Sequence, residues 1–556
     1  MSRAIPDRAR PRERTSSQVT NRPWYFDAVF YQVYPQSFQD TNGDGIGDLP
    51  GITRRLDYLQ YLGVDALWLS PIFVSPFCDA GYDVADYRKI APRYGTMADF
   101  RKMVREAHRR KIRILLDAVY NHTSIQHPWF AESRKQGRNP YSKWYMWSEP
   151  GKPPASKGGW WLHNEDGRHD QYLTEFHVYQ ESLNYGHKSL PRKFGNSPRD
   201  PDVARLHREM QGVTSFWLDE GVDGFRCDVP GNIGHKPCGY DRRLLEVFWR
   251  SIRKVCDRYG VRPLIAEEWV HPLEAVNEWG FNMCFTMHAW DMKRLMAAGK
   301  PGAGPFKGDP RVFDRALAKQ AGAVRPRDGA MVMFTCNHDS DRISESAGEH
   351  DPLTVIGILL VMTQNAVPKI YQGDEIGMIS DKTAPWKEWS MGRAQVRTPI
   401  QWTAGRNAGF SRAAAEKLYL PVSKGYRTRN VEAQMGKPGS VLEETRKIIA
   451  CWKAHPSLHP DGRKVTLHAR KNDPVYAYAR VNGGDRTIVA VNLSGKQAGA
   501  VLDCGKAANS RNILVRGLVS GHGTRFSPRV LGKSRGTALR VELPPYGWHI
   551  LEIRGF

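Results

Sequence analysis

The sequence predicts an α/β protein: a (β/α)₈ TIM barrel with an inserted subdomain after the third strand and a C-terminal antiparallel β domain. Eight short apolar runs recur between residues 29 and 373, and amphipathic stretches such as Met97–Arg110 and Asp202–Glu220 lie between several of them. Strands that alternate with helices form a parallel sheet, and eight such units close into a barrel. Beyond residue 463 the pattern changes to the residue-by-residue alternation of antiparallel strands.

Each of the eight runs is rich in branched and aromatic apolar residues and is short enough to be a buried strand. In chain order they are Val29–Pro35, Asp65–Pro71, Ile112–Asn121, Gly224–Val229, Pro263–Glu267, Phe281–Thr286, Met331–Asp339 and Pro368–Gly373. Functional residues of such barrels lie at the carboxyl ends of the strands. The polar residues that end these runs are therefore the candidates for chemistry.

The interval between the third and fourth strands is too long for a structureless loop in a compact protein. We therefore expect residues 23–122 and 198–462 to form the barrel and residues 123–197 an inserted subdomain over its mouth. Residues 463–556 are expected to form a C-terminal β-sandwich. Residues 1–22 contain a cluster of arginines that is typical of a basic, disordered tail.

Composition and charge favour an ordinary globular enzyme. The 556 residues are 40% hydrophobic and 25% charged, and the formal net charge is +23. The basic residues are scattered and form no nucleic-acid-binding module, so neither a nucleic acid nor a membrane is expected as a partner. The eight cysteines form no CxxC pair, and neither a secretory signal nor a run long enough to span a membrane is visible. A cytoplasmic enzyme is expected.

Two acidic residues end neighbouring predicted strands, and a third acid follows a later one. Period-2 alternation places Arg226 and Asp228 on one side of the fourth strand. The guanidinium is expected to keep the nucleophilic carboxylate ionised, whereas Glu267 leaves an apolar strand and is expected to hold a proton. Two such carboxyls suit a double-displacement glycosidase, with Asp339 close by. The alternative is that these residues form ion pairs that close the barrel mouth.

The same segments resemble a known family. DAVYNH (117–122), GFRCDV (224–229), AE (266–267) and NHDSDR (337–342) look like the four signature regions of the α-amylase family of glycoside hydrolases, in that family's order. Further segments are similar to it, and the resemblance spans about residues 24–556: GYDVADY (81–87), VPKIYQGDEIGM (367–378), RTPIQW (397–402), NAGFS (407–411), YLPV (419–422) and NVEAQ (430–434).

The resemblance implies a set of catalytic and sugar-binding residues. Asp228 corresponds to the nucleophile, Glu267 to the acid/base and Asp339 to the residue that stabilises the transition state. Glu268 is adjacent, but alternation directs it away from the site. The positions that match sugar contacts in the family are Tyr82, His122, Phe176, Gln180, Arg226 and His338.

The segment RTPIQW resembles a motif of α-glucosidases, oligo-1,6-glucosidases, trehalose synthases and sucrose isomerases. This likeness implies that Arg397 pairs with Asp79 and grips the terminal glucose, which favours exo-action on short substrates; the alternative is a surface ion pair. Relatives have Gln-Pro-Asp-Leu-Asn where this chain has Ser182 at the Asp position, which puts the bracing of that loop in doubt. Val229 resembles enzymes that act on α-1,6 bonds, although one methyl group discriminates weakly.

An acidic, glycine-rich loop follows the first strand. Oxygen donors at alternate positions can surround a hard cation, and the loop resembles the single Ca²⁺ or Mg²⁺ loop of the oligo-1,6-glucosidase group. The alternative is a turn with solvated acids. The expected ligands of a structural Ca²⁺ or Mg²⁺ are Asp40, Asn42, Asp44, Ile46 and Asp48.

Three functions are compatible with these residues. The leading hypothesis is a retaining, exo-acting α-glucosidase that hydrolyses short oligosaccharides or disaccharides with α-1,4 or α-1,6 bonds. The second is a transglucosylase or isomerase, such as a trehalose synthase, that uses the same glucosyl-enzyme. The third is a noncatalytic carbohydrate-binding member of the family; such relatives lose the catalytic acids, which this chain retains.

Overall fold

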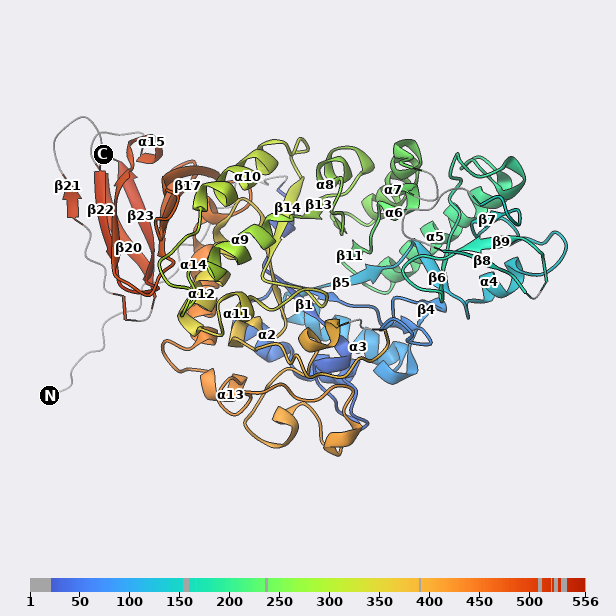
Figure 1. Cartoon of the computed structure of the whole chain (residues 1–556), viewed down its shortest axis with the longest axis horizontal. Coiled ribbons are helices and arrows are strands. Elements are labelled where there is room, and N and C mark those ends of the chain that lie inside the picture. The colour runs from blue at the N-terminus through green and yellow to red at the C-terminus, as the bar shows by residue number, and fades with distance from the viewer. Residues whose placement is uncertain are drawn as a thin grey trace.

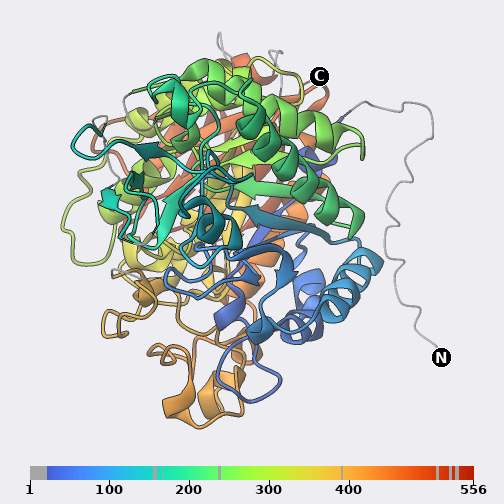
Figure 2. The same ribbon diagram turned by 90° about the vertical axis from the view of Figure 1, so that its right-hand side faces the viewer.

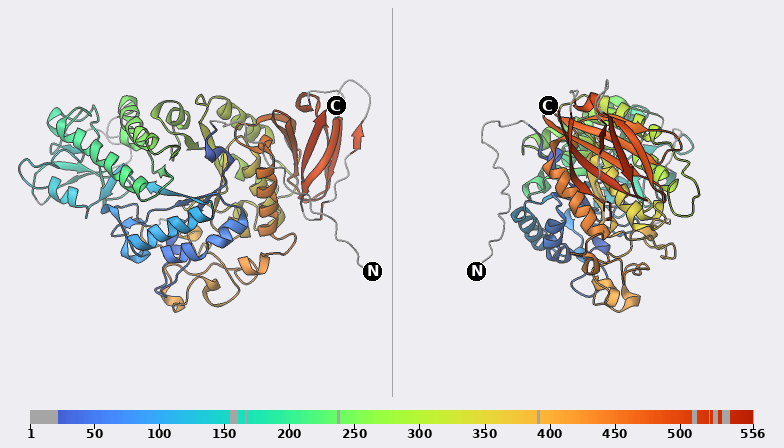
Figure 3. Two further views of the ribbon diagram at one scale, coloured as in Figure 1. Left: turned by 180° about the vertical axis from the view of Figure 1, so that it is seen from behind. Right: turned by 90° about the vertical axis from the view of Figure 1, so that its left-hand side faces the viewer.

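The computed structural model of the chain describes residues 22–153, 160–165, 167–235, 239–389, 392–508, 513–521, 523–524, 529–531 and 538–555. The predicted basic tail lies outside these residues, apart from Arg22. A closed barrel lies between an inserted segment at one end of the molecule and C-terminal sheets at the other, coloured cyan and red in Figure 1. The view from behind, on the left of Figure 3, shows the same arrangement.

The barrel consists of eight parallel strands in the order β1-β15-β14-β13-β12-β11-β5-β2, so the predicted fold class is confirmed. Each predicted run contains most or all of one strand. The seventh strand ends earlier than predicted because the chain turns after it, where the Asp339 N–H donates to Asn337 Oδ1 (3.0 Å). The strands are β1 Phe30–Val33, β2 Ala66–Leu69, β5 Arg113–Ala118, β11 Gly224–Cys227, β12 Leu264–Ala266, β13 Met283–Phe285, β14 Ala330–Phe334 and β15 Val367–Tyr371.

Helices cover the outside of the barrel. In α3, four apolar side chains on one face are buried, and a Thr96–Asp99 capping box fixes the first turn. None of the helices in the described ranges is long and apolar enough to cross a membrane. The outer helices are α1 Leu49–Arg54, α2 Leu56–Leu62, α3 Met97–Arg109, α5 Pro201–Asp219, α7 Arg242–Asp257, α8 Pro272–Glu274, α9 His288–Ala297, α10 Pro310–Gly322, α12 Asp351–Thr363 and α14 Val441–Ala454.

The segment inserted after β5 forms two small antiparallel sheets. One pairs β10 with β6, so that Ser182 lies opposite His122; the other has the order β7-β9-β8. Aromatic rings hold the segment together, as in the edge-on contact of Phe130 with Tyr172 at 5.0 Å. Its elements are β6 His122–Ser124, α4 Pro128–Ser133, β7 Trp147–Ser148, β8 Trp161–His163, β9 Gln171–Leu173 and β10 Gln180–Ser182.

The C-terminal residues form a five-stranded sheet, β16-β17-β18-β23-β20, and a three-stranded sheet, β19-β22-β21. In the described residues an apolar cluster that includes Leu502, Leu539 and Ile553 packs between strands of the two sheets. The strands are β16 Arg463–Ala469, β17 Val475–Asn482, β18 Asp485–Asn492, β19 Ala498–Asp503, β20 Ile513–Ser520, β21 Arg529–Leu531, β22 Ala538–Leu543 and β23 Trp548–Gly555.

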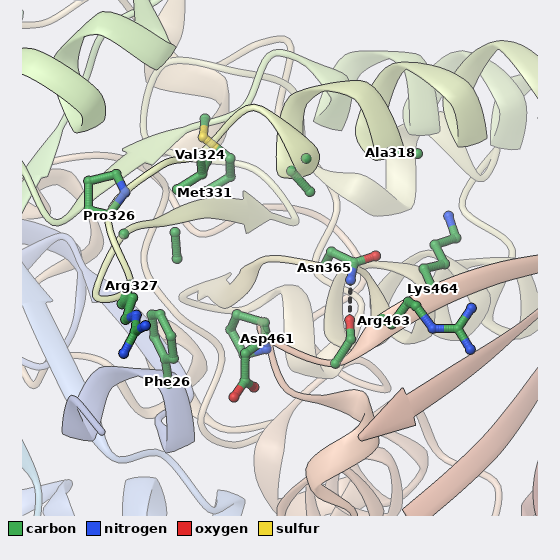
Figure 4. A pocket seen from close by; sticks show the side chains of 16 residues that line it. Phe26, Ala318, Val324, Pro326, Arg327, Met331, Asn365, Asp461, Arg463 and Lys464 are labelled. Carbon is green, nitrogen blue, oxygen red and sulfur yellow. Dashed lines mark hydrogen bonds between the residues drawn. The ribbon is translucent and has the colours of Figure 1, made fainter. Parts of the chain in front are cut away.

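A buried ion pair joins the barrel to these sheets. Lys464 Nζ of β16 lies 2.7 Å from Asp314 Oδ1 of α10, and it also donates to Gln364 and to the Tyr476 hydroxyl. Burial lowers the pKa of Lys464 to about 8, even though the carboxylate opposes the shift. A cavity of about 380 Å³ lies beside this contact, between the amino-terminal end of β14 and β16 (Figure 4). It contains none of the candidate catalytic residues.

Replacing Asp314 by Asn is expected to lower the thermal unfolding midpoint. The substitution leaves the Lys464 ammonium buried without a counter-charge, which costs about 3–5 kcal/mol. The matched control combines Asp314→Leu with Lys464→Met, removes both charges, and is expected to lose much less. Equal destabilisation in the two variants, measured by calorimetry at pH 7, would contradict this account.

Candidate active site

A cavity of about 360 Å³ opens at the carboxyl ends of the barrel strands. All three acids that the sequence selects contribute to its wall, together with five of the predicted sugar-contacting residues. The lining residues are Asp79, Tyr82, His122, Phe176, Gln180, Asp228, Val229, Glu267, Asp339 and Arg393. Three other predicted residues lie behind this wall and are almost fully buried: Arg226, His338 and Arg397.

One guanidinium joins the carboxyl groups at the bottom of the cavity. Arg226 Nη1 donates to Asp117 Oδ1 (2.6 Å) and to Asp228 Oδ1 (2.9 Å), and its Nη2 donates to Glu267. The contact between Arg226 and Asp228 agrees with the predicted alternation along β11. Glu268 is directed away from the cavity and accepts hydrogen bonds from the backbone N–H groups of Val270 and His271.

The pKa shifts within this cluster agree with the expectation for Glu267 but not for Asp228. Burial raises the pKa of Asp228 well above its usual range and also raises the pKa of Glu267, although the Arg226 guanidinium opposes both shifts. The charges of Glu267 and Asp117 raise the pKa of Asp228 further, and the charges of Asp339 and Asp117 do the same for Glu267. The raised pKa of Glu267 agrees with the expectation, whereas Arg226 does not lower the pKa of Asp228 as expected, because burial outweighs one guanidinium shared among three acids. Because the charge of Glu267 raises the pKa of Asp228, the two carboxyls titrate as a pair.

Asp339 has the opposite environment. Arg397 Nη2 lies 2.6 Å from Asp339 Oδ1 and Arg393 Nη1 lies 3.0 Å from the same oxygen. Burial alone would raise the pKa of this carboxyl, but the neighbouring imidazole and the two guanidiniums outweigh burial and lower the pKa far below its usual range. Asp339 is therefore a carboxylate at neutral pH.

The arginine that pairs with Asp79 is Arg393, which corrects the predicted pairing with Arg397. Arg393 Nη2 lies 3.1 Å from Asp79 Oδ1, and Gln180 Nε2 donates to Asp79 Oδ2 (2.9 Å). The chain makes a 3₁₀ turn, Arg393–Val396, so Arg393 faces the cavity while Arg397 is turned inward and donates to the backbone carbonyl of His338 (2.8 Å). The sequence signal that could have identified Arg393 is a second arginine four residues before the motif.

Aromatic side chains form the rest of the wall. The Tyr82 ring stacks on the His338 ring, with centroids 5.3 Å apart and planes at 2°, and its hydroxyl donates to Asp117 Oδ2 (2.9 Å). His122 Nε2 lies 2.9 Å from the Tyr82 carbonyl oxygen, which positions the imidazole at the cavity wall. Phe176 meets His122 edge-on, is 45% exposed and lines the cavity.

Ser182, which stands where the family resemblance leads us to expect an aspartate, makes a hydrogen bond of its own to the neighbouring loop. Ser182 Oγ donates to Glu175 Oε1 (2.8 Å), and Glu175 directly precedes Phe176. The backbone N–H of Glu175 also donates to the carbonyl of Gln180 (2.8 Å). The loop that carries Phe176 and Gln180 is therefore braced by a serine and a glutamate instead of the aspartate found in relatives.

The acidic loop after β1 is closed by its own hydrogen bonds. Asp40 accepts from the N–H groups of Gly43 (2.7 Å) and Gly45 (2.9 Å), and Asp48 Oδ1 caps α1 through the Gly51 N–H (2.6 Å). In Figure 2 this blue segment lies beside the orange residues that follow β15, in agreement with the Tyr419 N–H that donates to the Gly45 carbonyl. Within the described ranges, no group of three or more His, Cys, Asp and Glu side chains is placed to hold a metal. The oxygen-rich donor set nevertheless has the chemistry that hard cations prefer.

Comparison with known sequences identifies close likenesses. The chain is 32% identical over 544 residues to an oligo-1,6-glucosidase of Parageobacillus thermoglucosidasius, which covers 85% of this chain and 91% of that enzyme. It is 34% identical over 488 residues to a trehalose synthase/amylase of Mycolicibacterium smegmatis, covering 79% of this chain and 78% of the other.

Solved structures and a family model agree with these sequences. A trehalose-6-phosphate hydrolase of Bacillus licheniformis superimposes with a TM-score of 0.77 and 26% identity, over 96% of this chain and 100% of that one. An isomaltulose synthase of Erwinia rhapontici gives a TM-score of 0.75 and 27% identity, over 96% of this chain and 99% of the other. The model of the α-amylase catalytic domain matches residues 32–461. With this match and the site geometry together, the chain belongs to the α-amylase family of glycoside hydrolases.

Proposed function

We propose that the protein is a retaining, exo-acting α-glucosidase of short α-glucosides. The observation that carries the proposal is a group of ion pairs in the cavity wall. Arg393 joins Asp79 to Asp339 there, and these charged side chains would obstruct a sugar chain that extends beyond the residue bound next to Asp228. Three charged groups in that position also match adjacent hydroxyls of a terminal glucose. A cavity obstructed in this way and lined by both reacting carboxyls favours release of single glucose units.

The carboxyl pair supplies both steps of a double displacement. Asp228 attacks the anomeric carbon while the proton of the pair, carried by Glu267, moves to the glycosidic oxygen and the aglycone leaves. Glu267 then takes a proton from water as that water attacks the anomeric carbon and releases Asp228 from the ester. Two inversions give net retention. Asp339 stays ionised throughout and stabilises the cationic sugar of both transition states.

A transglucosylase is the second candidate. Its support is the 34% identity to a trehalose synthase/amylase and the half-exposed ring of Phe176 in the cavity wall, on which an acceptor sugar could stack. The two reactions share every step up to the glucosyl-enzyme and differ only in whether water or a sugar hydroxyl attacks it. A noncatalytic role is not favoured, because Asp228, Glu267 and Asp339 all face the cavity.

A product analysis tests the function. Maltose, isomaltose, sucrose and trehalose are supplied separately, and products are followed by anomer-resolved NMR. We expect α-glucose to be released first, and Asp228→Asn to lose about four orders of magnitude in kcat because the nucleophile is absent. Oligosaccharides or an isomerised disaccharide in place of glucose would favour the transglucosylase. First release of β-glucose, or full activity of Asp228→Asn, would refute the mechanism.

We also propose that the loop 40–48 holds one structural Ca²⁺ or Mg²⁺. Carboxylate oxygens of Asp40, Asp44 and Asp48, the amide oxygen of Asn42 and the carbonyl of Ile46 would supply the ligands. The ion would have no part in the chemistry. It would instead hold this loop against the segment around Tyr419.

Metal removal tests this site. A bound ion at a hundredfold excess over its Kd stabilises the folded state by about 2.7 kcal/mol, so EDTA is expected to lower the thermal midpoint and Ca²⁺ or Mg²⁺ to restore it. Asp44→Asn should abolish the metal-dependent part, whereas the control Asp57→Asn, on the exposed face of α2, should preserve it. A midpoint that neither EDTA nor added metal changes would show that the loop is closed by its own hydrogen bonds alone.

We infer a reducing, cytoplasmic location. The seven cysteines in the described part of the chain are all free, and six of them are buried. Alkylation of the unfolded protein from its host is expected to modify all eight cysteines of the sequence without prior reduction. A disulfide recovered from the native source would contradict the inference.

A further inference from the structure

A second buried cation, which the mechanism above does not use, lies inside the barrel. Lys369 of β15 is 1% exposed, and its Nζ lies among the rings of Trp68, Phe334 and Tyr371, at 5.2, 5.5 and 5.8 Å from their centroids. Burial lowers the pKa of this ammonium to about 7. Burying a charged amine among apolar rings costs free energy unless the amine is hydrogen-bonded.

A chain of hydrogen bonds runs from this lysine to the cavity. Lys369 Nζ donates to Gln32 Oε1 (2.8 Å), and Gln32 Nε2 lies 2.9 Å from His338 Nδ1. His338 Nε2 in turn lies 3.4 Å from Asp339 Oδ2. Lys369 lies on β15, Gln32 lies on β1, and the histidine and aspartate lie in the turn after β14. These three strands are neighbours in the barrel. The lysine is thus connected to a catalytic carboxylate through two side chains.

The chain determines which nitrogen of His338 carries the proton. Burial lowers the pKa of His338 well below its usual range, so the imidazole is neutral and has one ring proton. An ammonium has only donors, so the Gln32 oxygen must face Lys369 and the Gln32 amide nitrogen must face His338. Nδ1 must then accept a hydrogen bond. The proton is left on Nε2, where it points toward Asp339 and the bound sugar.

We propose that Lys369 is a positioning residue that sets the tautomer of His338 through the amide of Gln32. With Nε2 protonated, His338 can donate to Asp339 and to a hydroxyl of the sugar at the same end of the cavity. With the opposite tautomer, a lone pair would face the Asp339 carboxylate at 3.4 Å and repel it. The inference rests on the glucosidase reaction proposed above. It adds that Lys369 fixes the hydrogen bonds that His338 donates in the transition state of that reaction.

The effect of Lys369 on the tautomer of His338 depends on pH, because the charges around Lys369 set its pKa. Cys336 and Asp374 raise its pKa, whereas Lys293 and Arg226 lower it, and its second hydrogen bond goes to the Cys336 carbonyl oxygen (2.5 Å). Below a pH of about 7 the side chain is an ammonium and the amide of Gln32 has one allowed orientation. Above that pH the neutral amine has a lone pair, and either orientation of the amide becomes possible. The constraint is present on the acid side and relaxes on the alkaline side.

Two variants test the proposal with a disaccharide substrate. Lys369→Met keeps the volume and removes the donor, so kcat at pH 6 is expected to fall about tenfold with little change in KM, while the thermal midpoint stays the same or rises. The ratio of wild-type to variant kcat is expected to narrow as the pH rises from 6 to 8. Gln32→Glu is nearly isosteric but can only accept at His338, which forces the proton to Nδ1. It is expected to lose more activity than Lys369→Met.

The matched control combines Lys464→Met with Asp314→Leu, which removes a buried lysine together with its counter-charge outside the active-site cavity and should leave kcat unchanged. Wild-type kcat and an unchanged pH profile in Lys369→Met would overturn the proposal, as would full activity of Gln32→Glu. A fall in activity that follows a fall in thermal midpoint would also overturn it, because that result indicates a packing role. If the wild-type enzyme itself releases no glucose, the proposed glucosidase function is refuted, and the inference that rests on it is refuted too. Release of glucose by the wild-type enzyme and by Lys369→Met at equal rates would refute the inference alone.

Discussion

The site depends on one buried guanidinium. Arg226 contacts acids from three adjacent strands, β5, β11 and β12, inside a barrel where an unpaired charge of either sign would cost several kcal/mol. The contacts follow from register, since Arg226 lies directly opposite Asp117 of β5 and Ile265 of β12. Any slip of these strands by one residue would turn the charged side chains toward the helices. The closed barrel and the ionic cluster therefore depend on each other.

The cavity is asymmetric in charge. On one side a single guanidinium is shared among three acids, and burial raises the pKa values of the reacting pair. On the other side two guanidiniums hold the Asp339 carboxylate and lower its pKa. A proton is thus available where the glycosidic bond breaks, and a permanent negative charge lies where the sugar becomes cationic. Both conditions come from the fixed surroundings of the acids and hold before any substrate arrives.

Much of the barrel and of the candidate site could be predicted because both depend on local sequence. Runs of branched residues give strands, and strand alternation gives the shared orientation of Arg226 and Asp228. The predictions that the structure corrects concern features that depend on tertiary geometry. The chain path through Arg393–Val396 decides which arginine meets Asp79, and no periodicity encodes that turn. The pKa of Asp228 likewise depends on how deeply the whole cluster is buried, which sequence neighbours do not reveal.

Lys369 was missed for a different physical reason. In the sequence it is one polar residue within an apolar run, a pattern that fits a strand end as well as a functional position. Only closure of the sheet places β15 beside β1, so that Gln32 lies opposite Tyr371 and its amide reaches the lysine. Phe30 of β1 and Val367 of β15 lie two residues before these polar positions and are buried apolar side chains. The two strands thus contribute apolar packing to the barrel and also the polar side chains Gln32 and Lys369, whose burial costs free energy unless they are hydrogen-bonded to each other.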